Sequence, residues 1–149
     1  MIFCAGVFAE EKVAAPALDA GKYPQSTPAE ALVSIIKALE TRDLAYWVGN
    51  LILPSDTKRL VEKHGSVENV AARNADPARA SKLKSQCELM KKLLETNKTT
   101  QGETDGMKWV RYHSDATILQ FEKQADGRWY MNTRVTTMEK ATEAIEKKD

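Results

Sequence analysis

The sequence is poor in the residues that build metal centres and reactive thiols. Its 149 residues include only two cysteines and two histidines, and His64 and His113 lie far apart in the chain. Neither histidine belongs to a Cys/His cluster with the spacing of zinc ligands. The Gly-rich phosphate-binding patterns and the Gly-x-Ser-x-Gly pattern are also missing. We therefore expect neither a metal site nor a bound cofactor.

The sequence also lacks an excess of charge and a long apolar segment. The formal net charge is +1, and the few aromatic residues are not interleaved with basic residues as in a nucleic-acid platform. No stretch approaches the roughly 20 apolar residues that a membrane-spanning helix needs. These properties argue against nucleic acid as a partner and against a membrane span.

The first nine residues, MIFCAGVFA, carry no charge and precede the charged residues EEK. Val7 and Ala9 fit the small-residue pattern of a secretory cleavage site, although no basic residues precede the apolar stretch. We interpret residues 1–9 as a signal-peptide remnant, which predicts an exported protein, periplasmic or extracellular. The alternative is a short apolar N-terminus that packs on the domain. After cleavage Cys87 would be the only cysteine, which excludes an intramolecular disulfide.

Two further segments flank the expected domain, which covers residues 26–135. Residues 10–25 are rich in alanine and interrupted by prolines and a glycine, a composition typical of a flexible tether. Residues 136–149 are highly charged and contain few apolar residues. We interpret them as a charged tail that the core does not need.

The first half of the domain has the 3.6-residue periodicity of helices. Thr27, Pro28 and Glu30 form a capping box with proline at the first helical position, which predicts a helix over residues 28–41. The spacing of apolar residues predicts a second, short helix over residues 44–51.

The helical pattern continues as far as residue 98. Ser55 is predicted to cap a helix that stops at Gly65. Residues 66–98 indicate one or two further helices with a break or kink near Pro77. Cys87 falls in the apolar stripe of this segment, and we interpret it as a small buried residue.

From Thr99 the periodicity changes to that of strands, and two Asp-Gly dipeptides, at residues 105–106 and 126–127, predict hairpin turns. We expect Trp109 and the apolar residues of the neighbouring strands to face the same side of the sheet, under the helices. Helices followed by antiparallel strands indicate an α+β fold. We expect N-terminal helices packed on a curved antiparallel sheet of three to five strands.

These elements resemble the NTF2-like superfamily, the cystatin-like α+β roll, and in particular small exported bacterial proteins of unknown function. The resemblance is carried by residues 27–40, 44–53 and 107–133, with Asp126, Gly127 and Trp129 at the closing hairpin. One departure is that the helical stretch over residues 55–98 is long for the family and would displace or cover the usual pocket.

The resemblance implies a cone, in which the sheet wraps a long helix and leaves an apolar cavity open at one end. Family members include isomerases, dehydratases, binding modules and association domains, so the fold alone does not choose among them. We expect the cavity to be lined by large apolar residues from both layers: Leu32, Ile36, Trp47, Leu51, Trp109, Phe121, Trp129 and Met131.

Family enzymes place an Asp or His in the cone as a general base, often beside a Tyr, and the candidates here are Asp43, Tyr46 and His113. For Asp43 a cap or turn role, and for His113 a place at a strand end, are the more common explanations. We therefore assign no catalytic residue and favour an exported, non-catalytic domain that binds a small apolar ligand or a protein partner. A homodimer through the sheet is a further hypothesis. The alternative is a small cofactor-free isomerase or dehydratase with a carboxylate or histidine base.

Overall fold

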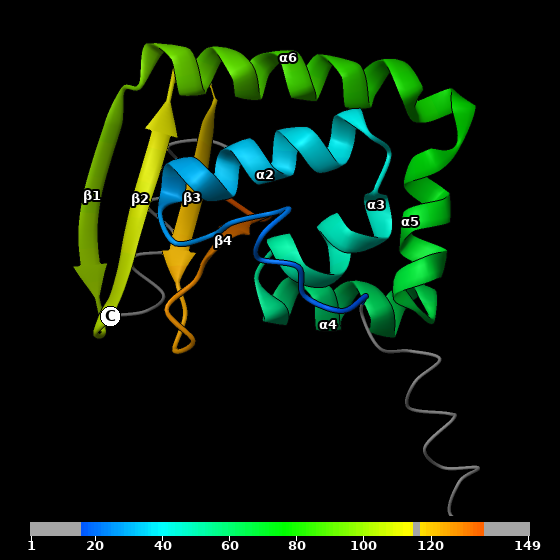
Figure 1. Ribbon diagram of the computed structural model, residues 1–149, viewed down its shortest axis with the longest axis horizontal. Coiled ribbons are helices and arrows are strands. Elements are labelled where there is room, and N and C mark those ends of the chain that lie inside the picture. The colour runs from blue at the N-terminus through cyan, green and yellow to red at the C-terminus, as the bar shows by residue number, and fades with distance from the viewer. Residues whose placement is uncertain (1–15, 115–116, 136–149) are drawn as a thin grey trace, which may run out of the picture.

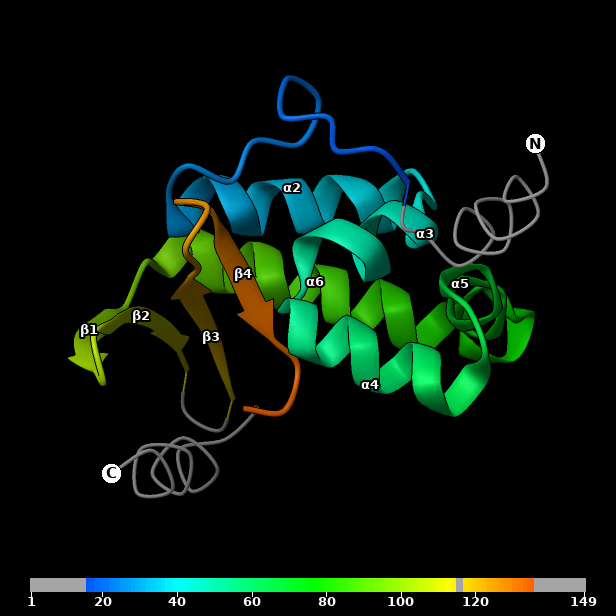
Figure 2. The ribbon, with the colours of Figure 1, turned by 90° about the horizontal axis from the view of Figure 1, so that it is seen from below.

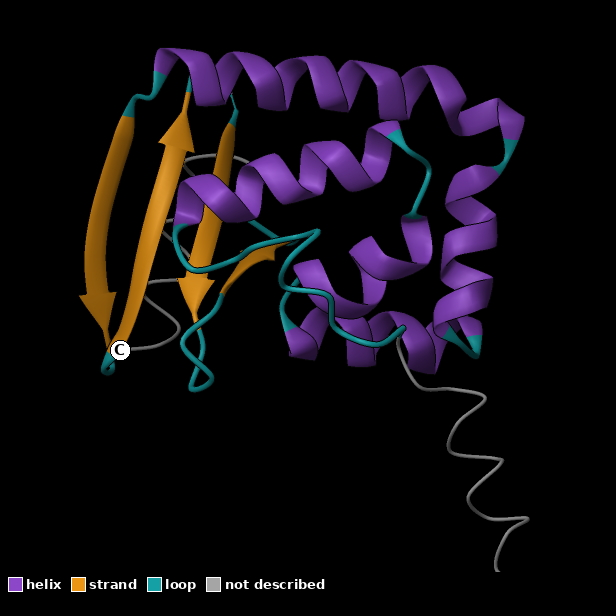
Figure 3. Ribbon diagram, in the orientation of Figure 1, coloured by secondary structure: helices purple, strands orange, loops and turns teal. Residues whose placement is uncertain are grey.

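A computed structural model describes residues 16–114 and 117–135 of the chain (Figure 1). The helices are α2 (Pro28–Glu40), α3 (Leu44–Tyr46), α4 (Pro54–His64), α5 (Val67–Ala75) and α6 (Ala80–Thr96), with a π-helical turn η1 (Trp47–Leu51) and a 3-10 turn η2 (Pro77–Arg79). The strands are β1 (Thr99–Thr104), β2 (Met107–His113), β3 (Ile118–Lys123) and β4 (Trp129–Asn132). Figure 3 shows the helices gathered beside the sheet, so the expected α+β fold class is confirmed.

Helix α2 begins as its sequence predicts. The Thr27 hydroxyl accepts a hydrogen bond from the backbone N–H of Glu30 at 3.1 Å, and Pro28 occupies the first turn. The Glu30 carboxylate in turn accepts one from the backbone N–H of Ser26 at 2.9 Å. These contacts satisfy donors that a helix N-terminus otherwise leaves unpaired.

Helix α4 begins two residues earlier than expected, which corrects the capping role assigned to Ser55. Pro54 is the first helical residue and Leu53 is the N-cap, with no side-chain cap. The backbone N–H groups of Asp56 and Thr57 donate to the Leu53 carbonyl. Proline is well placed at this position because its fixed φ suits a helix and its missing N–H would have had no partner.

The break expected near Pro77 separates α5 from α6. The Asp76 carboxylate accepts a hydrogen bond from the backbone N–H of Ala78 at 2.9 Å, and η2 then leads into α6. Helix α6 returns in the opposite direction to α2 and packs beside it (Figure 1). Cys87 lies buried on the packed face of α6, as expected.

The four strands form one antiparallel meander in the order β1-β2-β3-β4. Its register aligns Val110, Phe121 and Met131 across three strands, and these residues pack into the core under α2 and α6. Trp109 pairs with Glu122 on the other face. This corrects the expectation that Trp109 faces the helices, because strand residues alternate between faces and the core takes the Val110 set.

The face opposite the helices carries a polar network. Glu122 accepts hydrogen bonds from the side-chain amides of Gln120 at 2.7 Å and Asn132 at 2.8 Å. The Nε of Arg111 donates a hydrogen bond to the side-chain oxygen Oε1 of Gln120 at 2.7 Å. The side chains of Arg111, Gln120, Glu122 and Asn132 are all buried. Buried polar groups of this kind stabilise a fold only when they are paired.

A short segment from the helical layer pairs alongside β4, the last strand of the sheet. Ile52 forms an isolated parallel bridge with Met131, and the Leu53 N–H donates to the Met131 carbonyl at 3.0 Å. The chain between η1 and α4 is therefore tied directly to β4.

Residues 16–25 do not form the free tether that their composition suggested. Tyr23 is only 1% exposed, and its ring lies 4.3 Å from that of Tyr46. The side-chain amide of Gln25 donates to the carbonyls of Asn50 and Trp129. Aromatic burial and buried hydrogen bonds thus hold this segment on the domain.

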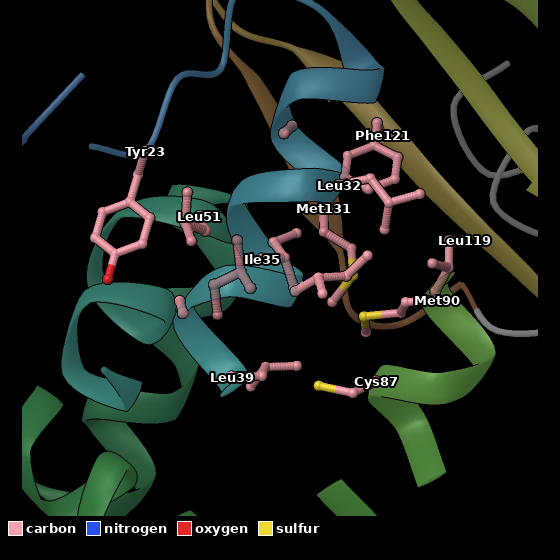
Figure 4. Close-up of a cluster of buried hydrophobic side chains, with 14 of the residues drawn as sticks. Tyr23, Leu32, Ile35, Leu39, Leu51, Cys87, Met90, Leu119, Phe121 and Met131 are labelled. Carbon is pink, nitrogen blue, oxygen red and sulfur yellow. The ribbon is translucent and has the colours of Figure 1, made fainter. Parts of the chain in front are cut away.

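The space between α2, α6 and the sheet is filled by side chains. Figure 4 shows Leu32 of α2 beside Phe121 of β3, and Leu39 of α2 beside Cys87 of α6. Among the described residues, no helix combines the length and the apolar character required to cross a membrane. The expected leader over residues 1–9 and the charged tail over residues 136–149 lie outside the described residues.

Candidate functional site

A cavity of about 640 Å³ lies beside the core, among α4, α5, α6 and the ends of β3 and β4. Figure 2 shows α4 starting beside the end of β4 and α5 standing at the opposite end of α4. This volume is within the range typical of small-molecule sites. Most of the lining side chains are apolar: Trp47, Val48, Ile52, Leu60, Val70, Leu83, Leu89, Met90, Ile118, Leu119, Met131 and Val135.

The apolar floor is almost completely buried. Val48, Ile52 and Ile118 are each 1% exposed, and Val70 is 2% exposed. They come from η1, the following bridge segment, β3 and α5, so helical and strand layers both contribute. A binding surface built from packed elements is held in shape without a ligand.

The polar lining residues are neutral or basic. Arg59, His64, Arg73, Arg79 and Lys82 line the cavity, and no Asp or Glu occurs among the described residues that line it. Arg59, Arg73 and Lys82 are exposed, whereas the apolar floor is buried. The cavity is therefore apolar inside and positively charged at its edge.

One of these cations, Arg59, lies near the carboxylate of Asp56. Asp56 is fully buried, and its Oδ1 lies 3.0 Å from Arg134 Nε and 3.7 Å from an Arg59 guanidinium nitrogen. Its Oδ2 accepts hydrogen bonds from the N–H and the hydroxyl of Thr133, both at 2.9 Å. These contacts connect α4 to the residues that directly follow β4. Asp56 itself does not line the cavity.

The other cations face the cavity without acidic partners. No ion pair joins Arg73, Arg79 or Lys82 to an acidic side chain in the described parts of the chain. Desolvation lowers the pKa of His64, and the charges of Arg73, Lys63 and Arg79 lower it further. Desolvation and the neighbouring cations thus both favour the neutral imidazole.

Trp47 places an unpaired donor in the cavity wall. It starts the π-helical turn η1, a wider turn than an α-helix that occurs often at functional sites. Its indole Nε1 is buried and has no hydrogen-bond acceptor within the described structure. An unpaired buried N–H of this kind costs free energy in the folded chain.

The residues expected to line a cone cavity divide among three places. Trp47 and Met131 line the cavity described here. Trp109 and Trp129 border a shallower hollow at the other end of the sheet, and Trp129 also packs into the core. The remaining expected residues fill the core: Leu32, Ile36, Leu51 and Phe121.

The three candidate catalytic residues are not brought together at the cavity. Asp43 accepts a hydrogen bond from the Tyr23 hydroxyl at 2.7 Å, and the Tyr46 hydroxyl accepts one from the backbone N–H of Asp19 at 2.9 Å. His113 pairs with Ile118 at the end of β2, and its Nε2 is buried without a partner in the described structure. None of the three lines the cavity.

The basic edge was missed by sequence reasoning. Arg73 and Arg79 stand on either side of Pro77, where the chain turns from α5 into α6. That break was recognisable, but no local pattern indicated that both side chains would face one cavity. The thiol of Cys87 is a weak candidate for chemistry, because burial raises its pKa and disfavours the thiolate.

Comparisons with known proteins gave no match to a family model, a curated protein or a solved structure. The function is therefore argued from the geometry and charge of the cavity.

Proposed function

We propose that this chain is a non-catalytic binding domain that takes a small, largely apolar molecule into the cavity among α4, α5 and α6. The observation that carries the proposal is a volume of about 640 Å³ with a mostly apolar lining, in which Trp47, Leu60 and Leu89 are only partly buried and so present apolar surface to a ligand. An apolar ligand is stabilised there because its surface leaves water, at roughly 25 cal/mol per Å² of apolar area.

The alternative of a cofactor-free isomerase or dehydratase has less support. Such an enzyme needs a general base within reach of the substrate in a site from which water is excluded. Asp43 binds Tyr23 outside the cavity, and His113 lies at a strand end. No observation favours this alternative over binding alone.

Three further parts of the proposal rest on narrower grounds. Export to the periplasm or the outside of the cell is supported by the sequence of residues 1–9 alone. Kinship with NTF2-like domains is supported by helices that precede an antiparallel meander. A homodimer through the sheet is supported by β1, which lies at the edge of the described sheet.

The binding proposal is tested with a neutral apolar fluorescent probe, N-phenyl-naphthylamine. We expect saturable binding with one probe molecule per chain. Leu89 lines the cavity and is partly buried, so Leu89→Trp should fill the site and weaken binding at least about tenfold.

The matched control is Val33→Trp on α2, because Val33 is exposed and outside the cavity. This variant should bind like the unmodified chain. Absence of saturable binding, or equal weakening by both substitutions, would overturn the proposal. Saturable binding of a protein partner that Leu89→Trp abolishes, without any small-molecule binding, would favour the partner hypothesis instead.

A further inference from the structure

We propose that the ligand of this cavity is a single-chain amphiphile with an anionic headgroup, a carboxylate or a phosphate. This inference rests on the proposed function and specifies the chemical class of the ligand. The chain of the amphiphile would occupy the apolar floor, and its headgroup would face Arg73, Arg79 and Lys82.

The first argument is the separation of polar and apolar surface within one cavity. Val70 on α5 and Met90 on α6 are buried in the floor, whereas Arg73 and Lys82 on the same helices are exposed at the edge. A wholly apolar ligand would leave this edge unused, and a wholly polar ligand would leave the floor unfilled. An amphiphile matches both surfaces at once.

The second argument is the sign of the charge. Arg73, Arg79 and Lys82 have no ion-pair partner in the described part of the chain, and no described lining residue is acidic. Arginine and lysine at the edge of a low-dielectric site attract an anion more strongly than they would in water. A cationic headgroup would be repelled by the same three side chains.

The third argument is that these charges lie close enough together to act on one group. His64, Arg73 and Arg79 all line this one cavity, and both guanidinium groups, after desolvation, contribute to the low pKa of His64, which lies on a third helical segment. Three segments, α4, α5 and η2, therefore direct basic side chains to one part of the edge. A headgroup with two or three oxygens can accept hydrogen bonds from several of them.

The experiment compares four ligands of one chain length, each below its critical micelle concentration: dodecanoate, dodecyl phosphate, dodecanol and dodecylamine. Binding to the full chain is measured by displacement of the neutral fluorescent probe. We expect at least one anion to bind about tenfold or more tightly than dodecanol. Dodecylamine should bind more weakly than dodecanol, and added salt should reduce the anion's advantage.

The decisive variant is the double substitution Arg73→Gln and Arg79→Gln. It should lower the affinity for the anion towards that for dodecanol and leave dodecanol binding unchanged. The matched control is Lys58→Gln with Lys92→Gln, which removes two exposed charges from α4 and α6 outside the cavity. The control should keep the anion's advantage.

The outcomes separate this inference from the proposed function. Equal affinity for dodecanol and both anions, or an anion preference that the double variant retains, overturns the inference but leaves the binding proposal intact. Failure of the neutral probe and of all four ligands to bind overturns both. A preference for dodecyl phosphate over dodecanoate, or the reverse, supports the inference and identifies the headgroup.

Discussion

Asp56 in the first turn of α4 and Thr133 directly after β4 are joined by two hydrogen bonds, although 77 residues separate them in the chain. The Asp56 carboxylate is fully buried, and one of its oxygens accepts from both the backbone N–H and the hydroxyl of Thr133. Arg134 and Arg59 balance its charge. Asp56 thus connects two segments that border the cavity.

We predict that Asp56→Ala lowers the free energy of unfolding by about 3 kcal/mol, as is typical when one partner of a buried charged network is removed. Urea unfolding measures this difference. Arg59→Gln is the control, because the Arg59 side chain is 48% exposed and its ion pair is long at 3.7 Å. Its cost should be at most about 1 kcal/mol. Equal costs for the two variants would contradict the view that Thr133 is the main partner.

Gly102 on β1 has no room for a side chain because the Trp109 indole covers it. A Cβ at residue 102 would lie 2.3 Å from the nearest ring atom. The ring would have to shift, which would disturb its contact with the Arg111 guanidinium, 4.0 Å from the ring centroid, and its N–H hydrogen bond to the Thr104 hydroxyl. We predict that Gly102→Ala destabilises the chain by about 1–2 kcal/mol.

Thermal unfolding and near-ultraviolet circular dichroism test this prediction together, since displacement of the indole should change the tryptophan signal. Gly21→Ala is the control, because the nearest atom to a Cβ there lies at 3.6 Å, an ordinary contact. It should change stability by less than about 0.5 kcal/mol. An unchanged spectrum for Gly102→Ala would show that the ring does not need to move.

Tyr130 makes stability depend on pH in the alkaline range. Burial, followed by its hydrogen bond to Asp126, raises the pKa of Tyr130 from 10.0 to about 12. Because the folded-state pKa lies above the unfolded-state pKa, the stabilisation is complete below pH 10 and is lost as the pH rises through 12. Tyr130→Phe should remove this dependence and cost about 1 kcal/mol near neutral pH.

The measurement is the difference in unfolding free energy between Tyr130→Phe and the unmodified chain across the pH range 9 to 12. The difference isolates Tyr130 from Tyr23 and Tyr112, whose pKa values are also raised. It should stay constant below pH 10 and shrink above it. A difference that does not vary with pH would mean that Tyr130 ionises equally in both states.

His64 should respond to changes at the basic edge of the cavity. Its pKa is lowered by desolvation, then by Arg73, Lys63 and Arg79. Since the folded-state pKa is below the ordinary value of 6.5, protonation at lower pH opposes folding. We predict that Arg73→Gln with Arg79→Gln raises this pKa, and that a bound anion also raises it.

Proton NMR follows this titration directly, because His64 and His113 are the two histidines of the sequence. An unchanged His64 titration in the double variant would mean that the two arginines do not act on it. In that case the basic side chains at the cavity edge would lie farther apart than the structure indicates.

Local sequence signals predicted most elements of the fold. The capping box at Thr27, the stop at Gly65 and the break at Pro77 each depend on neighbouring residues, and each is present in the structure. Asp105-Gly106 forms the expected hairpin turn, with positive φ at both residues. Such features can be predicted because their energetics are local.

Features that depend on distant residues could not be predicted in the same way. Either face of β2 was chemically able to meet the core, since one offers Trp109 and the other Val110 and Tyr112. The sheet register decided between them. The burial of Tyr23 likewise depends on Tyr46 and Asp43, which come later in the chain, so the composition of residues 10–25 misled the prediction for that segment.

The candidate site combines both kinds of feature. Trp47 and Met131 line a cavity beside the core, which is not the cone cavity that was expected, and other residues predicted for the cone fill the core. The arginines at the edge were not expected, because their convergence depends on how α5 turns into α6. The helical segment over residues 55–98, expected to displace or cover a pocket, supplies much of the cavity wall.

The bridge between Ile52 and Met131 has a consequence for how a ligand reaches the cavity. Both residues line the cavity, and the N–H of Leu53 donates a hydrogen bond to the Met131 carbonyl. In hydrogen exchange the Leu53 amide should be protected, because exposing it requires the bridge between this segment and β4 to open. The solvent-facing turns of α5 and η2 need no such opening. Entry and release should therefore proceed by small displacements of these turns over a floor that remains closed.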